Sequence, residues 1–387
     1  MFEEFLTPLR IEDIVDLETL NPDQLGSVID MHLTTAPDIE KSDIVIIGVN
    51  DDRGSARNKG CAKAPDAVRK QLYQLYTQNK HVRIADLGNI ERGATLRDTY
   101  IALSKVVLEV LYYKCVPVVI GGGHDLTYGH YGGYQETGRM INLAVVDSMI
   151  DIRENEEEID ADNFLITLLT HQPNYLFNYS HVAYQTHFSS PLTIDTLDKL
   201  HFDMIRLGKV RENIREIEPL MRDTDMLSFD MTAVRFSDAP GNKNATPNGL
   251  TGEDACQIAR YAGLSDKLTS LGLYEVNPVA DTRDQTVQLA SQMIWYFVDG
   301  YYNRRKLQPS DENRDFTKYL VHFKDTNFEM VFWKNVKTDM WWMEVPSGNK
   351  SKRPDKKHLI PCSYEDYQLA CREELPERWL KTHEKLS

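Results

Sequence analysis

The chain has 387 residues, 41% apolar and 27% charged, which suffices for one large α/β domain and a smaller unit. Its formal net charge of −15 excludes the basic face that a nucleic-acid-binding protein needs. The acidic N-terminus has no signal-peptide pattern and no apolar stretch approaches the ~20 residues of a membrane span, so we expect a cytoplasmic protein without membrane contact.

Short apolar runs rich in β-branched residues predict strands that are buried on both faces. These runs are 43–49, 116–120, 143–146, 201–207, 226–229 and 270–276. Helical periodicity lies between many of them, at 64–75, 97–113, 253–262 and 286–302. Strands that alternate with helices predict a mostly parallel sheet with helices on both faces. Binding sites in such sheets gather at the carboxyl ends of the strands.

The composition changes after residue 302. The polar segment 303–314 is typical of a linker, so the sequence predicts a main domain over 1–302 and a small α+β appendage over 315–387. In the appendage we expect strands at 316–323, 328–334 and 339–345, a basic loop at 350–357, a helix that starts after Ser363 and a last helix at 376–385.

Aromatic residues are frequent in this appendage. The run from Met340 to Glu344 alternates poorly between polar and apolar residues, which indicates burial on both faces. A strand that covers the core is the simpler interpretation. The alternative is a surface for a protein partner, because tryptophan and methionine are enriched in interface cores.

Polar clusters directly follow three of the predicted strands. The first cluster holds His124 after Gly121-Gly-Gly, the second holds Asp147 and Asp151, and the third holds Asp230. Carboxylates that leave apolar strands are costly unless they are paired or bound to a metal. Each cluster also has a structural interpretation, since glycines form tight turns and an aspartate after a strand is often a helix N-cap. Three clusters in order favour a metal site.

The three clusters resemble a known family. GGGHD, DSMID and SFDMT stand where the arginase/agmatinase/formimidoylglutamase (ureohydrolase) family has Gly-Gly-(Asp or Gly)-His, Asp-Ala-His-X-Asp and Ser-Phe-Asp-X-Asp. GGGHD and Arg153 are similar to the formimidoylglutamase branch. Further similarity extends over about 42–302, including 48–73, 239–251 and 274–278. The resemblance implies a three-layer α/β/α arginase-like fold and hydrolase ancestry, on linear amidine C–N bonds.

The resemblance also implies a centre of two Mn²⁺ ions, of which this chain keeps half. The ligands of one ion correspond to His124, Asp147, Asp151 and Asp230. The two ligands private to the other ion, a histidine and an aspartate, are replaced by Met149 and Thr232. A thioether and a neutral hydroxyl are poor ligands for a hard ion, so we expect at most one Mn²⁺. The alternative is that the four remaining residues persist only as hydrogen-bonding groups.

Two other functional positions follow from the resemblance. Glu275 matches the carboxylate that anchors the cationic nitrogen of the substrate, and its structural alternative is a buried glutamate bonded to the backbone. The proton-handling histidine of arginases has no clear counterpart, although His187 is a candidate.

The sequence therefore leaves two functions open. One is a pseudoenzyme or scaffold that has lost ureohydrolase turnover. The other is an active hydrolase of a formimidoylglutamate- or guanidino-type ligand that uses a single Mn²⁺. The resemblance implies a homo-oligomer, and the five scattered cysteines are typical of reduced thiols in a cytoplasmic protein.

Overall fold

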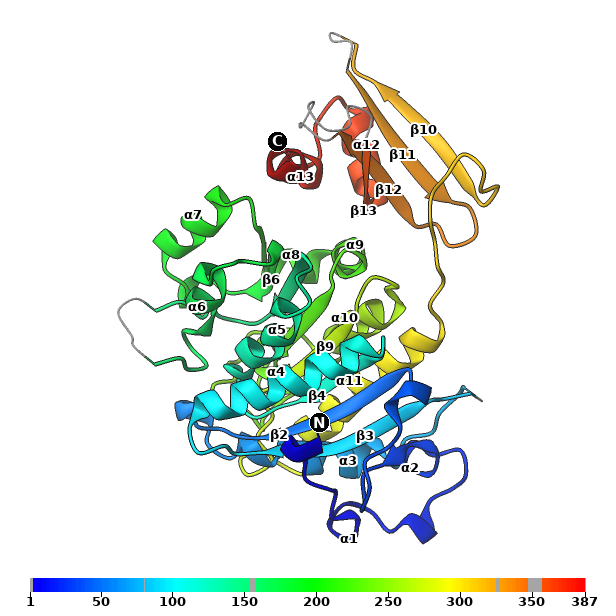
Figure 1. Cartoon of the computed structure of the whole chain (residues 1–387). Helices are drawn as coiled ribbons and strands as arrows, with labels where there is room; N and C mark the ends of the chain where they lie inside the picture. The colour runs from blue at the N-terminus through cyan, green and yellow to red at the C-terminus, as the bar shows by residue number, and fades with distance from the viewer. Residues whose placement is uncertain (1–2, 80, 154–157, 325–327, 347–356, 387) are drawn as a thin grey trace.

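A large parallel sheet forms the centre of the main domain (Figure 1). The computed structural model describes residues 3–79, 81–153, 158–324, 328–346 and 357–386. Within them, nine strands run parallel in the order β1-β3-β2-β4-β9-β8-β5-β6-β7. Their bounds are β1 Asp30–Met31, β2 Ile44–Asn50, β3 Ile84–Glu91, β4 Val116–Ile120, β5 Ile141–Val146, β6 Leu176–Tyr184, β7 Asp203–Arg206, β8 Met226–Asp230 and β9 Ser270–Tyr274.

Helices cover both faces of this sheet, so the predicted three-layer α/β/α fold is confirmed. One face packs against α3 (Ala64–Leu72), α8 (Leu207–Glu212), α9 (Ile217–Arg222), α10 (Gly252–Leu264) and α11 (Gln285–Tyr302). The other face packs against α4 (Leu96–Tyr112), α5 (Leu126–Gln135), α6 (Phe164–Thr170) and α7 (Pro191–Lys199). The short helices α1 (Ile11–Ile14) and α2 (Leu25–Val28) lie near the first edge of the sheet.

The side-chain alternation of the strands explains the two layers. In β2, Ile44 and Ile46 belong to the core beneath α3 and α11, whereas Val45 and Ile47 belong to the core beneath α4. A strand buried on both faces must be apolar at every position, which is the pattern that predicted these strands. The strands β3 and most of β6 were not predicted, because buried polar residues interrupt their apolar runs.

The appendage is an antiparallel sheet with helices on one face. The sheet runs β10 (Phe316–His322), β11 (Glu329–Asn335), β12 (Trp341–Pro346) and β13 (Lys357–Cys362) in chain order. Helices α12 (Tyr364–Cys371) and α13 (Glu377–Leu386) follow, and Ser363 caps α12 in a capping box. Of the predicted basic loop, 350–356 lies outside the described residues and Lys357 begins β13.

Strand β12 is buried on both faces, as the run from Met340 to Glu344 indicated. Trp341 and Met343 pack under α12 and α13, and Trp342 packs on the opposite face with Leu307 of the linker. Trp342 also lies against the main domain, because the guanidinium of Arg222 sits 4.3 Å from its ring. The run is thus core of the appendage and part of its contact with α9.

Among the described residues, none of the helices combines the length and the apolar character that a bilayer crossing requires. The longest of them, α11, covers the central sheet.

Candidate functional site

The candidate site lies at the carboxyl edge of the central sheet, where β4, β9, β8 and β5 are neighbours. The loop after β4 carries His124, the loop after β5 carries Asp147 and Asp151, and β8 ends at Asp230. Backbone packs tightly here, because a Cβ on Gly122 would lie 1.8 Å from the carbonyl oxygen of Asp51. Only glycine fits such a close approach.

The four side chains predicted as ligands of one metal ion lie together. Nδ1 of His124 is 3.0 Å from Oδ2 of Asp151, 3.2 Å from Oδ2 of Asp230 and 3.3 Å from Oδ2 of Asp147. All four residues are buried, with His124 fully so. Nε2 of His124 points away from them, 3.1 Å from the hydroxyl of Ser228.

Charge is unbalanced around this imidazole. Nδ1 can carry only one hydrogen, so it cannot donate to three carboxylates at once. Oδ2 of Asp147 is buried and makes no hydrogen bond to any described residue. Burial and the neighbouring Asp147 raise the pKa of Asp151 well above its usual range, and burial also raises the pKa of Asp230. Against its burial, the three carboxylates raise the pKa of His124.

These features fit one divalent cation. His124, Asp147 and Asp151 each offer a ligand atom within 4.8 Å of the others, and Asp230 contacts the same imidazole nitrogen. Carboxylate oxygens with one imidazole nitrogen suit a metal such as Mn²⁺. A cation at this point would neutralise the carboxylates and satisfy Oδ2 of Asp147.

The positions of the two replaced ligands flank the same group. The hydroxyl of Thr232 donates to Oδ1 of Asp147 at 2.6 Å, and the main-chain N–H of Met149 donates to that oxygen at 3.1 Å. Asp230 also caps the short 3₁₀ turn Met231–Ala233, since its Oδ1 accepts from the N–H of Thr232 at 2.6 Å. Asp230 is therefore an N-cap, as one interpretation of the sequence had it, and it also contacts His124.

Glu275 joins three segments behind this group. Its Oε1 accepts from the main-chain N–H of His124 at 2.9 Å, and its Oε2 accepts from Ser55 at 2.8 Å and from Asn58 at 2.7 Å. Its backbone has a positive φ of 63°, an uncommon conformation for a residue with a side chain. Burial and the charge of Asp230 raise the pKa of Glu275 to about 8.

A narrow cavity of about 10 Å³, room for about one water molecule, opens onto the site. Met149, Thr232, Asp151 and Glu275 are among the residues that line it. This volume is far below the range usual for pockets that bind small molecules.

An ion pair at the rim of this cavity was not predicted from the sequence. Arg57 and Asp162 line the cavity and pair with each other, and Arg153 also pairs with Asp162. Arg57 lies in the segment 48–73, which resembles the family. This resemblance was the one feature of the sequence that could have drawn attention to Arg57. Asp162 lies in the acidic segment 153–163, for which no functional role was predicted.

The histidine suggested for proton handling lies elsewhere. His187 is in the exposed 3₁₀ turn Thr186–Phe188, and its ring contacts Phe188. A different histidine, His181 in β6, is buried behind the site, with Nε2 3.3 Å from the carbonyl oxygen of Asp147. Burial lowers the pKa of His181 to about 4, so it is neutral at ordinary pH.

The chain is similar to known proteins in both sequence and structure. A model described as the arginase family matches residues 42–299. A formimidoylglutamase of Lysinibacillus sphaericus (strain C3-41) is 26% identical over 302 residues, which cover 74% of this chain and 92% of that protein. A crystal structure of Trypanosoma cruzi formiminoglutamase with Mn²⁺ aligns with a TM-score of 0.66 and 25% identity, over 73% of this chain and 99% of that chain.

A formimidoylglutamase structure from Bacillus subtilis has a similar TM-score of 0.65 at 19% identity, covering 73% of this chain and 92% of that chain, and supports the fold. The match to the family model ends at residue 299, so the linker and the appendage lie outside it.

Proposed function

The chain belongs to the arginase family, and from this membership we propose that it binds one divalent metal ion and has lost ureohydrolase turnover. The proposal rests on one observation: the ligands expected for one metal ion are all present, and two of the ligands expected for the other ion are replaced. Asp147, Asp151 and Asp230 each lie within 3.3 Å of Nδ1 of His124, whereas Met149 and Thr232 stand where two further ligands are expected. A protein of this kind acts as a metal-stabilised scaffold or binding protein.

The contacts of Thr232 support a single ion. Its hydroxyl hydrogen points at Oδ1 of Asp147, so this oxygen already accepts a short hydrogen bond. A second cation at that oxygen would have to displace the hydroxyl and would gain only a neutral ligand. The thioether of Met149 is soft and offers little to a hard ion.

Glu275 supports the loss of turnover. Both of its carboxylate oxygens accept hydrogen bonds from the chain itself, from Ser55, Asn58 and the main chain of His124. A substrate cation would have to compete with these donors. Glu275 in this arrangement positions the loops around the site.

A single-metal hydrolase is the second candidate, because two of the four proposed ligands, Asp151 and Asp230, line the cavity. A divalent ion bound there would lower the pKa of a bound water and polarise an amidine carbon. The charged rim of Arg57 and Asp162 would orient an amino-acid-like substrate such as formimidoylglutamate. The formimidoylglutamases among the relatives make this the first substrate to test.

Metal analysis together with an activity assay tests the proposal. Protein purified without chelator and loaded with Mn²⁺ should retain one ion per chain and should not hydrolyse formimidoylglutamate, arginine or agmatine. Asp147→Asn and Asp230→Asn should each remove the ion, whereas Asp195→Asn, an exposed carboxylate in α7, should not. Hydrolysis that depends on Mn²⁺ and disappears in Asp147→Asn would establish the second candidate instead.

A further inference from the structure

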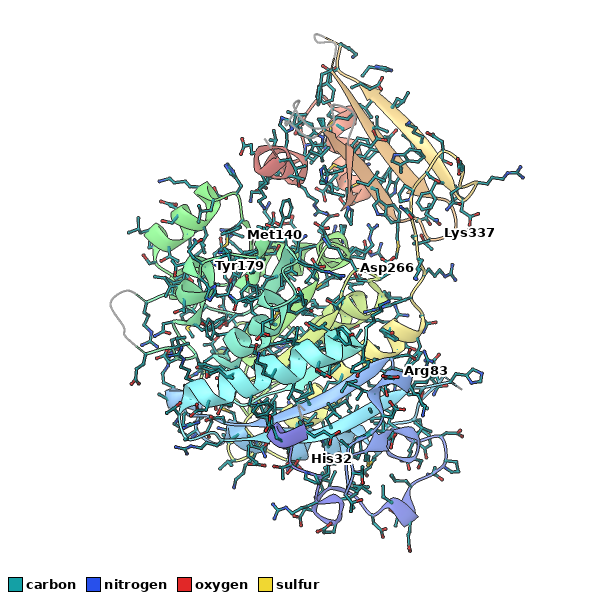
Figure 2. All side chains as sticks on the ribbon, in the orientation of Figure 1. His32, Arg83, Met140, Tyr179, Asp266 and Lys337 are labelled. Carbon is teal, nitrogen blue, oxygen red and sulfur yellow. The ribbon has the colours of Figure 1, made fainter. Side chains whose placement is uncertain are left out.

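A second cavity lies at the opposite edge of the sheet from the candidate site. It has a volume of about 230 Å³ and lies between α13 and the amino ends of β5, β6, β7 and β8. Asn142 near the start of β5, Asp203 at the start of β7 and Thr224 just before β8 line one side. Tyr179, labelled in Figure 2, marks the position of β6 in the main domain.

One face of α13 supplies the opposite wall. Arg378, Lys381, Thr382 and Lys385 all line the cavity, and their spacing of i, i+3, i+4 and i+7 places them on one stripe of the helix. Trp379 points the other way, into the core of the appendage. A basic stripe turned inward is unexpected in a chain whose net charge is −15.

Cations outnumber carboxylates on the walls. Lys267 joins the three basic residues of α13, and the aspartates that line the cavity are Asp203 and Asp223. Lys267 pairs with Asp223 at 2.7 Å. Asp203 accepts hydrogen bonds from Asn178 at 2.8 Å and from Ser180 at 3.1 Å, and it is the carboxylate that faces α13.

Two of the cations on α13, Arg378 and Lys385, have no carboxylate within hydrogen-bonding distance among the described residues. The nearest ion-pair partner of Arg378 is Asp366, at 3.8 Å. Lys385 donates to the side-chain oxygen of Asn178, and no ion pair joins it to a carboxylate within the described ranges. Burial lowers the pKa of Lys385, although the charges of Asp203 and Asp223 act in the opposite direction. Lys381, by contrast, pairs with Glu377 at 2.8 Å.

We propose that this cavity binds a small organic dianion, a phosphate ester or a dicarboxylate, between Arg378 and Lys385. A guanidinium binds carboxylate and phosphate oxygens in a bidentate manner, and an ammonium adds a point charge. The two residues are seven positions apart, about 10 Å along the helix, within reach of one small ligand. Apolar residues such as Leu220 and Ile360 also line the cavity and would contact the body of the ligand.

Such a ligand would hold the two units together. It would contact α13 of the appendage and the amino ends of main-domain strands, while the candidate metal centre lies at the carboxyl ends of β5 and β8. The proposal therefore assigns a binding site that is separate from the proposed function and does not depend on it.

Inorganic phosphate and succinate serve as probes of the metal-loaded protein, at constant ionic strength set with chloride. We expect saturable binding by calorimetry, a rise in Tm, and slower hydrogen exchange in α13 and at the start of β6. The probe that binds more tightly identifies the phosphate or the dicarboxylate class. Arg378→Gln and Lys385→Gln should each weaken binding by about tenfold or more, because each removes a charged hydrogen-bond donor. Lys199→Gln, an exposed lysine in α7 outside the cavity, is the matched charge control.

A second pair of variants keeps the test decisive if the first pair folds poorly. Thr382→Glu places a carboxylate in the cavity and should abolish binding of both probes, whereas the neutral Thr382→Gln should retain it. Asp230→Asn should leave the affinity unchanged, because it alters only the candidate metal centre. Binding that disappears in Asp230→Asn but persists in Thr382→Glu would place the anion at the metal centre and overturn the proposal. Absence of saturable binding by either probe would also overturn it.

Discussion

The hydroxyl of Thr232 donates a hydrogen bond to Oδ1 of Asp147 over 2.6 Å, and this contact joins the ends of the neighbouring strands β8 and β5. The same oxygen accepts the main-chain N–H of Met149. Oδ1 of Asp147 therefore already accepts two hydrogen bonds from the protein. A second cation would need this oxygen as a ligand.

Restoring both lost side chains should therefore restore a second ion. In Met149→His, Thr232→Asp, the short hydrogen bond is replaced by an anionic ligand and an imidazole is added, so we expect the Mn²⁺ content to rise from one to two ions per chain. Elemental analysis after dialysis measures this. Met149→Leu, Thr232→Ser is the matched control, and it should stay at one ion. An unchanged content in the restored variant would show that more than these two ligands has been lost.

Arg222 should anchor the appendage to the main domain. Its Nη2 donates to the carbonyl oxygens of Trp341 at 3.0 Å and Cys362 at 3.3 Å, and the side chain is 7% exposed. Arg222→Ala leaves these buried groups without a donor, which costs about 1–3 kcal/mol. We expect faster proteolytic cleavage within the linker 303–314 and a lower free energy of unfolding.

The control for this variant is Arg235→Ala. Arg235 pairs with Asp238 inside the main domain, and both side chains are partly exposed, so the change should cost less than about 1 kcal/mol. Equal cleavage rates of the linker in the two variants would contradict the anchoring role of Arg222.

His130 should make the protein sensitive to acid. It is buried in α5, its Nδ1 is 2.9 Å from the hydroxyl of Tyr274, and burial lowers its pKa from 6.5 to about 3. Below pH 6.5 the unfolded chain binds a proton at this residue that the folded chain does not. The free energy of unfolding should then fall by about 1.4 kcal/mol per pH unit, until the pH reaches the folded-state pKa.

Urea unfolding at pH 7 and pH 5 measures this effect. His130→Gln cannot take up the proton, so between these two values the wild type should lose about 2 kcal/mol more stability than the variant. Other groups titrate equally in both proteins and cancel in the comparison. If the two proteins lose stability in parallel, His130 is protonated in the folded state and the stated cause is wrong.

The main strands of the sheet could be predicted from the sequence because a strand buried on both faces is apolar throughout. The strand β3 could not, since Asp86 and Asn89 interrupt its apolar run. These two residues are buried because Arg69, itself fully buried, donates to Asp86 at 2.8 Å and to Asn89 at 2.6 Å. Such a polar network depends on contacts between helix and strand, which sequence periodicity does not report.

The candidate ligands could be predicted because they follow strands that end at the same edge of the sheet. The rim pair of Arg57 and Asp162 could not, because it joins two loops that are about 100 residues apart in the chain. The cavity beside α13 was also missed, although the spacing of Arg378, Lys381 and Lys385 is visible in the sequence. A basic stripe on a helix usually faces solvent, and only the packing of the appendage turns this one inward.

The position of β9 determines when the sheet becomes whole. It is the last strand of the main domain to be synthesised, yet it lies between β4 and β8 in the middle of the sheet. Before residues 270–274 leave the ribosome, the earlier strands can pair only as two separate halves, each with an open inner edge. Arrival of β9 closes both edges and brings Glu275 to the main-chain N–H of His124, 151 residues earlier in the chain. We expect a chain truncated after residue 265 to be protease-sensitive and bound by chaperones, whereas a chain that ends at residue 302 resists digestion, and a protease-resistant shorter chain would disprove this order of assembly.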